Sequence, residues 1–473
     1  MTSPAARDDR RRWLALYILC TGVLMIVLDT TIVTVALPTI QQELGFDAGG
    51  LTWVLNAYML TFGGFLLLGG RLGDLYGQRR LFLLGLAVFT VASLACGIAS
   101  TRLALIIARA VQGLGGAVVT AVALSLIMNL FTGGDDRARA LGIYGFVCAA
   151  GGSLGELLGG VVTNELGWQW VFLINLPIGV AVYLSCVALL PDDRGTGEHR
   201  QLDAAGALTA TLGLMVAVFA VVGGNEAGWT SVRTLGLLAV AMLLLSAFLV
   251  IESRAPVPLV PLRLFRLRNV SVANGLSVLW AAGMFGWFVI SALYMQAVLG
   301  YDPLQVGLAF LPADAIMAVF SAGLSARLVI RYGVRLPAFA GLLVGAAGLL
   351  LFARAPLDGR FVADVLPGMV LLGIGSGLAF NPLLLAAMND VDPAESGVAS
   401  GIVNTSFMMG GALGLAVIAS LADARTRAVA AEGLAPVAAL NEGYRLAFLA
   451  GAVLSLLAAL GTALLRNRAR DQA

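Results

Sequence analysis

The sequence predicts an all-α integral membrane protein that crosses the bilayer about fourteen times. Of its 473 residues, 59% are hydrophobic and only 12% are charged, whereas an ordinary soluble domain carries about 25% charged residues. Apolar runs of about twenty residues recur from Trp13 to Leu465, and each can cross a hydrocarbon core about 30 Å thick. The longest polar interval, residues 192–201, is too short to fold as a soluble domain.

Six apolar runs precede that polar interval, and each predicts one spanning helix. They are Trp13–Leu37, Leu51–Leu72, Leu81–Ala99, Leu103–Leu130, Ala138–Thr163 and Trp170–Leu190. Two further runs follow the interval, at Ala204–Val222 and Leu235–Val250. The last six are Val270–Leu299, Pro303–Ile330, Leu336–Phe352, Val362–Leu385, Gly397–Ala422 and Tyr444–Leu465.

The basic residues are distributed unevenly between the two sides of the predicted helices. All 29 are arginines. With the N-terminus placed in the cytoplasm, Arg109 lies within a helix, and seven arginines lie outside: Arg102, Arg233, Arg354, Arg360, Arg425, Arg427 and Arg445. The other twenty-one lie on the cytoplasmic side. The positive-inside rule therefore predicts an even number of helices and places both termini in the cytoplasm.

A short segment occurs twice in the chain. RLGDLYGQR, residues 71–79, aligns with RLVIRYGVR, residues 327–335, at five of nine positions. Each follows the second helix of a six-helix set, as expected for duplicated halves. We therefore predict an N-terminal six-helix bundle at 1–190, two inserted helices with cytoplasmic linkers at 191–268, and a C-terminal six-helix bundle at 269–473.

Several classes of chemistry lack the residues they need. The four cysteines lie inside predicted helices without CxxC spacing and are interpreted as apolar filling, and the single histidine, His199, lies in a polar loop. No cleavable signal peptide is expected, because the first apolar run is too long. A Walker-type phosphate loop needs a lysine that the chain lacks. We therefore expect no metal site, no cofactor and no direct use of ATP.

Four motifs resemble those of one transporter family. GRLGDLYGQRR at Gly70–Arg80 resembles the signature loop GxLxDRxGRR of the major facilitator superfamily, and LDTTIVTVALP at Leu28–Pro38 resembles a first-helix signature. RAVQG at Arg109–Gly113 resembles the fourth-helix RxxQG motif, and WQWVFLINLPIG at Trp168–Gly179 adds to the resemblance. Together they identify the chain, over nearly its whole length, as similar to the fourteen-helix drug:proton antiporters of the EmrB/QacA type.

Two segments depart from the family pattern. The fifth-helix exporter motif GxxxGPxxGG here is GGSLGELLGG at 151–160, so Glu156 replaces proline. In NTSFMMGGALGLAV at 404–417, Phe407 and Met408 stand where relatives often have Arg-Gln. These departures leave open whether the chain shares the broad range of cationic drugs associated with the family.

The resemblance implies a major facilitator fold and a secondary transporter that exports small organic compounds in exchange for protons. It implies a monomer in the bacterial inner membrane, with a small organic substrate, protons and lipid as partners and no nucleic acid. The alternatives are a narrow-substrate metabolite transporter or a lipid transporter. An integral-membrane enzyme would need a metal or nucleophile site, and a receptor would need a soluble domain; neither is visible in the sequence.

Asp29 and Arg109 are the first candidates for proton coupling. Asp29 lies halfway along the first apolar run, where an ionised carboxylate costs about 2.5–3.5 kcal/mol. Arg109 could face Asp29 across the bundle, and the resemblance extends a role in proton transfer to Arg109, with Gln112 beside it. The alternatives are a capping aspartate near the membrane surface and an arginine whose head reaches the interface.

Two more acids are predicted to lie deep in the membrane. Glu156 in the fifth helix and Asp314 in the tenth are surrounded by apolar residues or glycine. Each is a candidate proton site, and Glu156 is also a candidate contact for a cationic substrate. The alternative for Glu156 is a protonated acid that donates to a nearby carbonyl oxygen.

Small and charged residues are predicted to control conformation. Gly151, Gly155, Gly159 and Gly160 would let the fifth helix approach a neighbour closely and move against it. Three charged residues, Asp74, Arg79 and Arg80, would pair with helix ends at the cytoplasmic side and close that gate. For the arginines, the plain alternative is the positive-inside rule.

A binding cavity for organic molecules needs aromatic and apolar walls with a few polar groups. The predicted substrate residues are Trp53, Asn56, Tyr58, Gln112, Glu156, Trp287, Tyr294, Asn381, Asn404 and Phe407. Trp280, Phe285, Gln296 and Met408 are further candidates. The alternative for each aromatic residue is packing or lipid contact.

Overall fold

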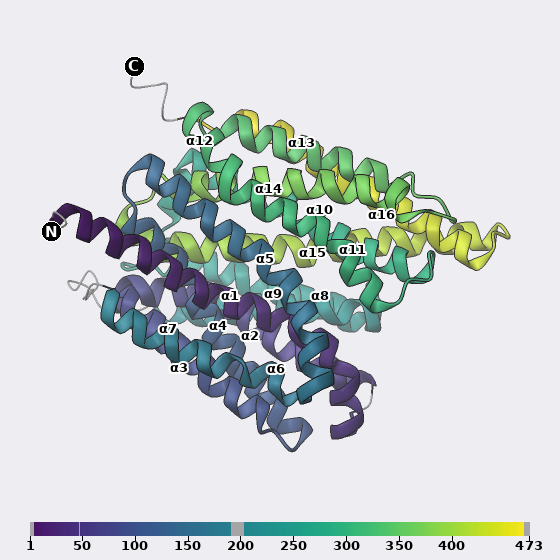
Figure 1. The fold of residues 1–473 in the computed structure, drawn as a ribbon, viewed down its shortest axis with the longest axis horizontal. Helices are drawn as coiled ribbons and strands as arrows, with labels where there is room; N and C mark the ends of the chain where they lie inside the picture. Colours follow the sequence, from purple (N-terminus) through teal and green to yellow (C-terminus); the bar gives the residue numbers. More distant parts are fainter. Residues whose placement is uncertain (1–3, 47, 191–202, 468–473) are drawn as a thin grey trace.

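The computed structural model describes residues 4–46, 48–190 and 203–467, and its regular elements are all helices (Figure 1). The N-terminal elements are α1 (Pro4–Leu44), α2 (Ala48–Tyr76), α3 (Gln78–Gly97), α4 (Arg102–Leu130), α5 (Gly134–Leu166), α6 (Gln169–Leu173) and α7 (Asn175–Leu189). Then come α8 (Ala204–Ala227), α9 (Val232–Arg254) and the short η1 (Leu262–Arg266).

The C-terminal elements are α10 (Arg268–Ala297), α11 (Pro303–Val319), the π-helical η2 (Phe320–Ser325), α12 (Ala326–Tyr332) and α13 (Arg335–Phe352). They continue with η3 (Phe361–Val365), α14 (Leu366–Met388), η4 (Pro393–Glu395), α15 (Ser396–Ala431), α16 (Pro436–Gly461) and η5 (Thr462–Leu464).

The number of long helices agrees with the predicted fourteen. Thirteen stretches of the described residues are long and apolar enough to cross a membrane. Helix α5, of 33 residues, packs along α1 and is the remaining long helix. Four predicted spans each cover more than one element. Trp170–Leu190 covers α6 and α7, and Pro303–Ile330 covers α11, η2 and α12. Val362–Leu385 covers η3 and α14, and Tyr444–Leu465 covers α16 and η5. At the π-helical turn, the carbonyl oxygen of Ser321 accepts a hydrogen bond from the Asn381 side chain.

Several helices are longer than predicted, and the largest extensions are in α1, α15 and α16. Helix α1 continues past Pro38 to Leu44, α15 continues past Ala422 to Ala431, and α16 begins at Pro436 instead of Tyr444. These extensions carry polar residues, which hydropathy excludes from a span although a helix can continue into water. In α15 the extension holds an ion pair between Arg427 and Asp423, one turn apart.

The repeated segment has the same local structure in both halves. Helix α2 ends at Tyr76 and is followed by Gly77 with φ 99°, while α12 ends at Tyr332 and is followed by Gly333 with φ 75°. Glycine adopts this left-handed conformation without the steric cost that other residues incur. The shared Tyr-Gly pair therefore ends a helix and turns the chain in both places.

The two ends of the chain lie at one face of the molecule. The first turns of α1 and the last turn of α16 lie at the left of Figure 1, and we name this end the terminal face. The ends of α2, α4 and α14 and the starts of α5 and α15 also lie there. Helices α8 and α9 pack on each other, and α8 contacts both α2 and α15. The inserted pair thus touches both halves of the chain.

Candidate functional site

A fully buried ion pair lies inside the N-terminal helices. The Arg109 side chain of α4 donates to the Asp29 carboxylate of α1 over 2.6 Å, and neither side chain is more than 1% exposed. Arg109 also donates to the carbonyl oxygen of Val54 in α2, at 3.0 Å. A buried charge is tolerated when it is paired and its remaining hydrogen-bonding groups are satisfied. The ion pair therefore joins three helices.

Three polar side chains complete the surroundings of Asp29. Its second oxygen accepts from Gln112 at 2.8 Å and from Asn175 of α7 at 2.9 Å. Gln112 also donates to Ser93 of α3 at 2.8 Å and accepts from Arg109 at 2.6 Å. We name Asp29, Ser93, Arg109, Gln112 and Asn175 the charge network. Each is at most 2% exposed, so a change in the charge of one member alters the hydrogen bonds of the others.

Aromatic rings enclose the guanidinium of Arg109. The ring centroid of Tyr58 lies 4.3 Å from its central carbon, and that of Phe172 lies 5.6 Å away. Such cation–π contacts stabilise a desolvated cation by about 2 kcal/mol. The Tyr58 hydroxyl is buried without a hydrogen-bond partner. Tyr58 therefore lies beside the charge network as an unused hydrogen-bonding group.

The glycine face of α5 packs on the part of α1 that carries Asp29. A Cβ at Gly151 would meet Val27, and at Gly159 it would meet the Ile32 carbonyl oxygen at 2.8 Å. At Gly155 it would meet Thr31 and lie 3.0 Å from the Leu28 carbonyl oxygen.

The expectation that Gly160 shares this face is wrong, because nothing lies within 4 Å of a Cβ there; one residue beyond Gly159, the helix has turned by about 100°. The side chain of Glu156 lies outside the described residues.

A second polar cluster joins the two halves at the terminal face. Asp74, near the end of α2, accepts from the backbone N–H groups of Gly397 and Val398 in the first turn of α15, at 2.8 and 2.9 Å. Gln78 donates to Asp74 at 3.3 Å and to Ser396 at 3.0 Å. A carboxylate at a helix N-terminus satisfies free N–H groups and interacts favourably with the helix dipole. We name this set, with Ser125 and Asn129, which also bond Ser396, the Asp74 latch.

The two arginines predicted, like Asp74, to pair with helix ends differ from each other. Arg79 donates to the carbonyl oxygen of Val187, near the end of α7, at 2.7 Å, so it contacts a helix end within its own half. Arg80 is exposed. Another arginine, which the motif reading missed, crosses between halves: Arg137 of α5 donates to Asn389, directly after α14, at 2.9 Å.

Aromatic side chains from both halves of the chain contact one another. Tyr144 of α5 stacks on Phe380 of α14 with ring centroids 6.4 Å apart. Phe380 contacts Trp280 of α10 at 5.9 Å, and Trp280 contacts Phe407 of α15 at 5.5 Å. Phe285 lies 5.7 Å from Phe407. We name these five residues the aromatic cluster. Phe407 is partly buried, so part of its ring is accessible.

The other predicted substrate residues have diverse surroundings. Trp53 is 36% exposed and contacts Phe219 of α8, while Asn56 is half-buried. Half-buried Asn404 donates to the Ser400 carbonyl oxygen one turn earlier.

The remaining candidates belong to the interior of the C-terminal helices or border it. Trp287 and Tyr294 are buried in an apolar core there, and the Tyr294 hydroxyl donates to the carbonyl oxygen of Pro356. Asn381 is buried against Ser321. Asp314 is half-buried in α11.

Ser93 and Asn175 were missed by sequence reasoning. Serine is common in membrane helices, and Asn175 stands inside the WQWVFLINLPIG motif without any sign of its partner. In the part of the chain that the structure describes, no three His, Cys, Asp or Glu side chains are grouped so that they could hold a metal ion.

The chain was compared with known proteins. The family model described as Major Facilitator Superfamily matches residues 19–415. The puromycin resistance protein pur8 of Streptomyces alboniger is 38% identical over 97% of this chain and 92% of its own. The cephamycin export protein CmcT of Amycolatopsis lactamdurans is 40% identical over 97% of this chain and 93% of its own. The multidrug resistance protein Stp of Mycobacterium tuberculosis is 35% identical over 87% of this chain and 76% of its own.

Solved structures share the fold at low identity. The human organic anion transporter MFSD10 has a TM-score of 0.69 at 18% identity and covers 98% of this chain and 100% of its own. The proton:xylose symporter XylE has a TM-score of 0.68 at 13% identity, with 96% and 95% covered. At these identities the likeness concerns the architecture alone.

Proposed function

This chain belongs to the major facilitator superfamily, whose members are transporters and not enzymes, and from this premise we propose that it exports small organic compounds in exchange for protons. The observation that carries the proposal is the buried pair of Asp29 and Arg109 with its three polar partners. Such a pair holds a carboxylate ionised in a dry interior, so a proton that reaches Asp29 cancels its attraction for Arg109.

The coupling step follows from the geometry of the charge network. Protonation of Asp29 removes one charge of the ion pair, and Arg109 is then left with the carbonyl oxygens of Val54 and Gln112. Because Asp29 and Arg109 lie on different helices, the weakened pair releases α1 from α4. The glycine face of α5 borders the same part of α1, so the change is transmitted to α5, which also contacts the C-terminal half at Phe380.

The Asp74 latch supports an assignment of the conformational state. Its contacts, together with that of Arg137 and Asn389, join the halves at the terminal face. We assign this face to the cytoplasm, in the inner membrane of a bacterium, because most arginines lie there. The structure then corresponds to a state closed toward the cytoplasm. Rocking of bundles 1–190 and 269–473, with 191–268 between them, would open it.

The driving force is sufficient for export. Inward movement of one charge through 100 mV supplies about 2.3 kcal/mol, which corresponds to about fiftyfold accumulation because each 1.4 kcal/mol is tenfold. A pH gradient adds to this. A single chain holds both the charge network and the aromatic cluster, so a monomer is sufficient for this mechanism.

The substrate class is inferred from the relatives and the aromatic cluster. The relatives are named for export of, or resistance to, antibiotics, and aromatic walls with few charges suit apolar or weakly polar organic molecules. A second candidate is a narrow exporter of one antibiotic, because two of these relatives are named for a single compound.

Transport into inverted vesicles tests the proposal. With an interior made acidic, puromycin, a cephamycin and cationic, neutral and anionic dyes are offered in turn. We expect accumulation of at least one compound that stops when the pH gradient is collapsed. Asp29→Asn should abolish coupled accumulation, whereas Asp423→Asn, at an exposed surface ion pair, should not.

Accumulation that persists without a proton gradient would exclude proton antiport. Uptake of only one of the antibiotics would favour the narrow exporter.

A further inference from the structure

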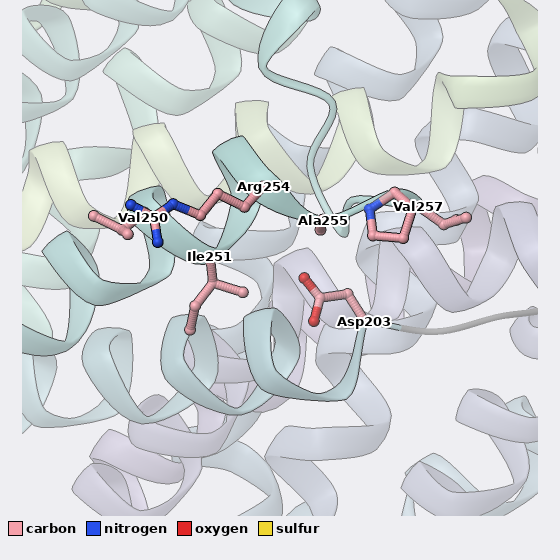
Figure 2. Close-up of a pocket in the computed structure, with 7 residues that line it drawn as sticks. Asp203, Val250, Ile251, Arg254, Ala255 and Val257 are labelled. Carbon is pink, nitrogen blue, oxygen red and sulfur yellow. The ribbon is translucent and has the colours of Figure 1, made fainter.

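A pair of acidic side chains, Asp203 and Glu252, lies outside the charge network where the inserted helices reach the terminal face. Asp203 precedes the first turn of α8, and its Oδ1 accepts from the backbone N–H of Gly206 at 2.8 Å. Asp203 also lines a cavity of about 440 Å³ with residues 250, 251 and 254–257. Figure 2 shows the Asp203 carboxylate directed from the start of α8 toward the 255–257 segment.

Glu252 lies in the last turn of α9 and is only 3% exposed. One oxygen accepts from the backbone N–H of Val260 in the linker after α9. The other oxygen, Oε2, is buried without a partner, as is Oδ2 of Asp203. Both free oxygens lie within 2.9 Å of the position that a Cβ would take at Gly206. The two free oxygens therefore lie beside the same glycine.

Two adjacent carboxylates with free, buried oxygens are incompatible with two negative charges. Two like charges beside the same glycine raise the energy of the doubly ionised pair, and each free oxygen also lacks a hydrogen bond. We propose that Asp203 and Glu252 form a proton-binding site, in which one proton is shared between Oδ2 of Asp203 and Oε2 of Glu252. The proton enters from water in the adjoining cavity and returns to it. One O–H···O hydrogen bond then satisfies both oxygens.

The charged neighbours permit one negative charge at this site. Arg71 of α2 is close enough to Glu252 for their charges to attract, and Arg254 of α9 lines the same cavity as Asp203. On η1, Arg263 is paired with Glu395 at 2.7 Å. A divalent ion held by protein oxygens alone would need about six ligands, and no third acid, histidine or cysteine among the described residues joins the pair. A proton requires only two oxygens.

The site is connected to the Asp74 latch through packing. Glu252 holds the linker at Val260, and Val260 packs in one apolar cluster with Leu264, Val398 and Ile402. Val398 supplies one of the two backbone N–H groups that Asp74 accepts. Loss of the shared proton would make the carboxylates repel and displace the linker from the first turn of α15. The protonated pair therefore holds the terminal face closed, and ionisation loosens it.

Two measurements on the full-length protein in detergent test the site. Infrared spectroscopy at neutral pH should show a protonated-carboxyl band that Glu252→Gln and Asp203→Asn each remove, while Asp29→Asn and Asp423→Asn leave it in place. Spin labels on cysteines introduced at exposed Arg139 and Arg331, in a background without the native cysteines, report the distance across the terminal face. In the wild-type protein this distance should increase as the pH rises.

Glu252→Gln removes one of the two carboxyl groups, so the pair can no longer become doubly charged and the label distance should stay at the closed value. Asp203→Asn keeps a side chain suited to a helix N-terminus and provides the same test if Glu252→Gln does not fold. The proposal is overturned if both variants keep the band and the wild-type pH profile, or if Ca²⁺ or Mg²⁺ removes the band. Because Asp29→Asn does not affect this readout, its result is independent of the proposed antiport mechanism.

Discussion

The two halves of the chain share a scaffold but differ in the chemistry of their interiors. Among the described residues, the N-terminal half buries an ion pair and three polar partners between α1, α3, α4 and α7. The main interior cluster of the C-terminal half holds Trp287, Phe310, Phe352 and Phe448. The N-terminal half therefore buries charged and polar groups, whereas the main interior cluster of the C-terminal half is apolar.

The repeated loop shows the same divergence at shorter range. Asp74 and Gln78, which build the latch, correspond to Ile330 and Val334 in the second copy. The C-terminal copy keeps the helix-ending glycine but has no carboxylate at this position for the start of α5. Instead, the C-terminal half supplies the helix N-terminus that Asp74 binds. Both copies therefore keep the turn that ends the helix, but only the N-terminal copy carries the latch residues.

The two halves remain alike where α1 and α10 meet their glycine-bearing partners. Gly155 of α5 closely approaches Thr31 and Leu28 of α1, and Gly410 of α15 closely approaches Val278 of α10. Close helix contact requires a small residue in both places. Close contacts at glycine are therefore common to both halves, whereas among the described residues the latch carboxylate and the buried ion pair occur in one half only.

Removal of the buried arginine should have the largest effect. Arg109→Met removes the partner of the buried Asp29 carboxyl group, which should destabilise the protein by about 3–5 kcal/mol. Thermal unfolding in detergent measures this loss, and the double variant with Asp29→Asn should recover much of it. Arg102→Met, at an exposed arginine of the same helix, is the control. Equal losses in the single and double variants would contradict the pairing.

Removal of the latch carboxylate should affect conformation more than stability. Asp74→Ala deletes two charge-assisted hydrogen bonds, each worth about 1.5–3 kcal/mol, and should open the terminal face in a larger fraction of molecules. Labelling of a cysteine introduced at Ser400, buried beside the latch, measures that fraction. Ile330→Ala, the same change at the corresponding position of the other half, should leave it unchanged. Equal labelling of both variants would contradict the difference between Asp74 and Ile330 in the two halves.

Adding a side chain at the close helix contacts of Gly155 and Gly410 should destabilise the protein by similar amounts in both halves. Gly155→Ala and Gly410→Ala each force a methyl group against a neighbouring helix and should destabilise by about 1–3 kcal/mol. Gly160→Ala meets open space and should be neutral or slightly stabilising, because alanine favours helix more than glycine. Unfolding curves of the three variants decide the matter. If Gly160→Ala lowered the free energy of unfolding as much as Gly155→Ala, the close helix contact at Gly155 would be contradicted.

Loss of one ring of the aromatic cluster should have the smallest effect. Phe407→Ala removes contacts with Trp280 and Phe285, and aromatic pairs contribute about 0.5–1.5 kcal/mol each. We expect a several-fold rise in KM for the exported compound, with protons exchanged per substrate unchanged. Phe339→Ala, an exposed ring on α13, is the matched control. A change in proton stoichiometry would place Phe407 in the coupling step instead.

Part of the site follows from the sequence and part does not. A carboxylate halfway along an apolar run needs a partner, so Asp29 and Arg109 could be paired by charge alone. Ser93 and Asn175 could not, because uncharged polar residues occur in many membrane helices without a specific partner. Trp287 and Tyr294 fit the composition of a binding wall, yet they lie in the apolar core of one half.

The sequence by itself determined the membrane class, the order of the spans, the unequal distribution of arginine and the duplicated loop. These properties depend on local composition and spacing, because each helix satisfies its own backbone hydrogen bonds. Only the tertiary structure decided that Asp74 binds the start of α15, 323 residues away, and that Asp203 and Glu252 each place an oxygen beside Gly206. Such contacts depend on the rotation and depth of each helix against its neighbours, which hydropathy does not encode.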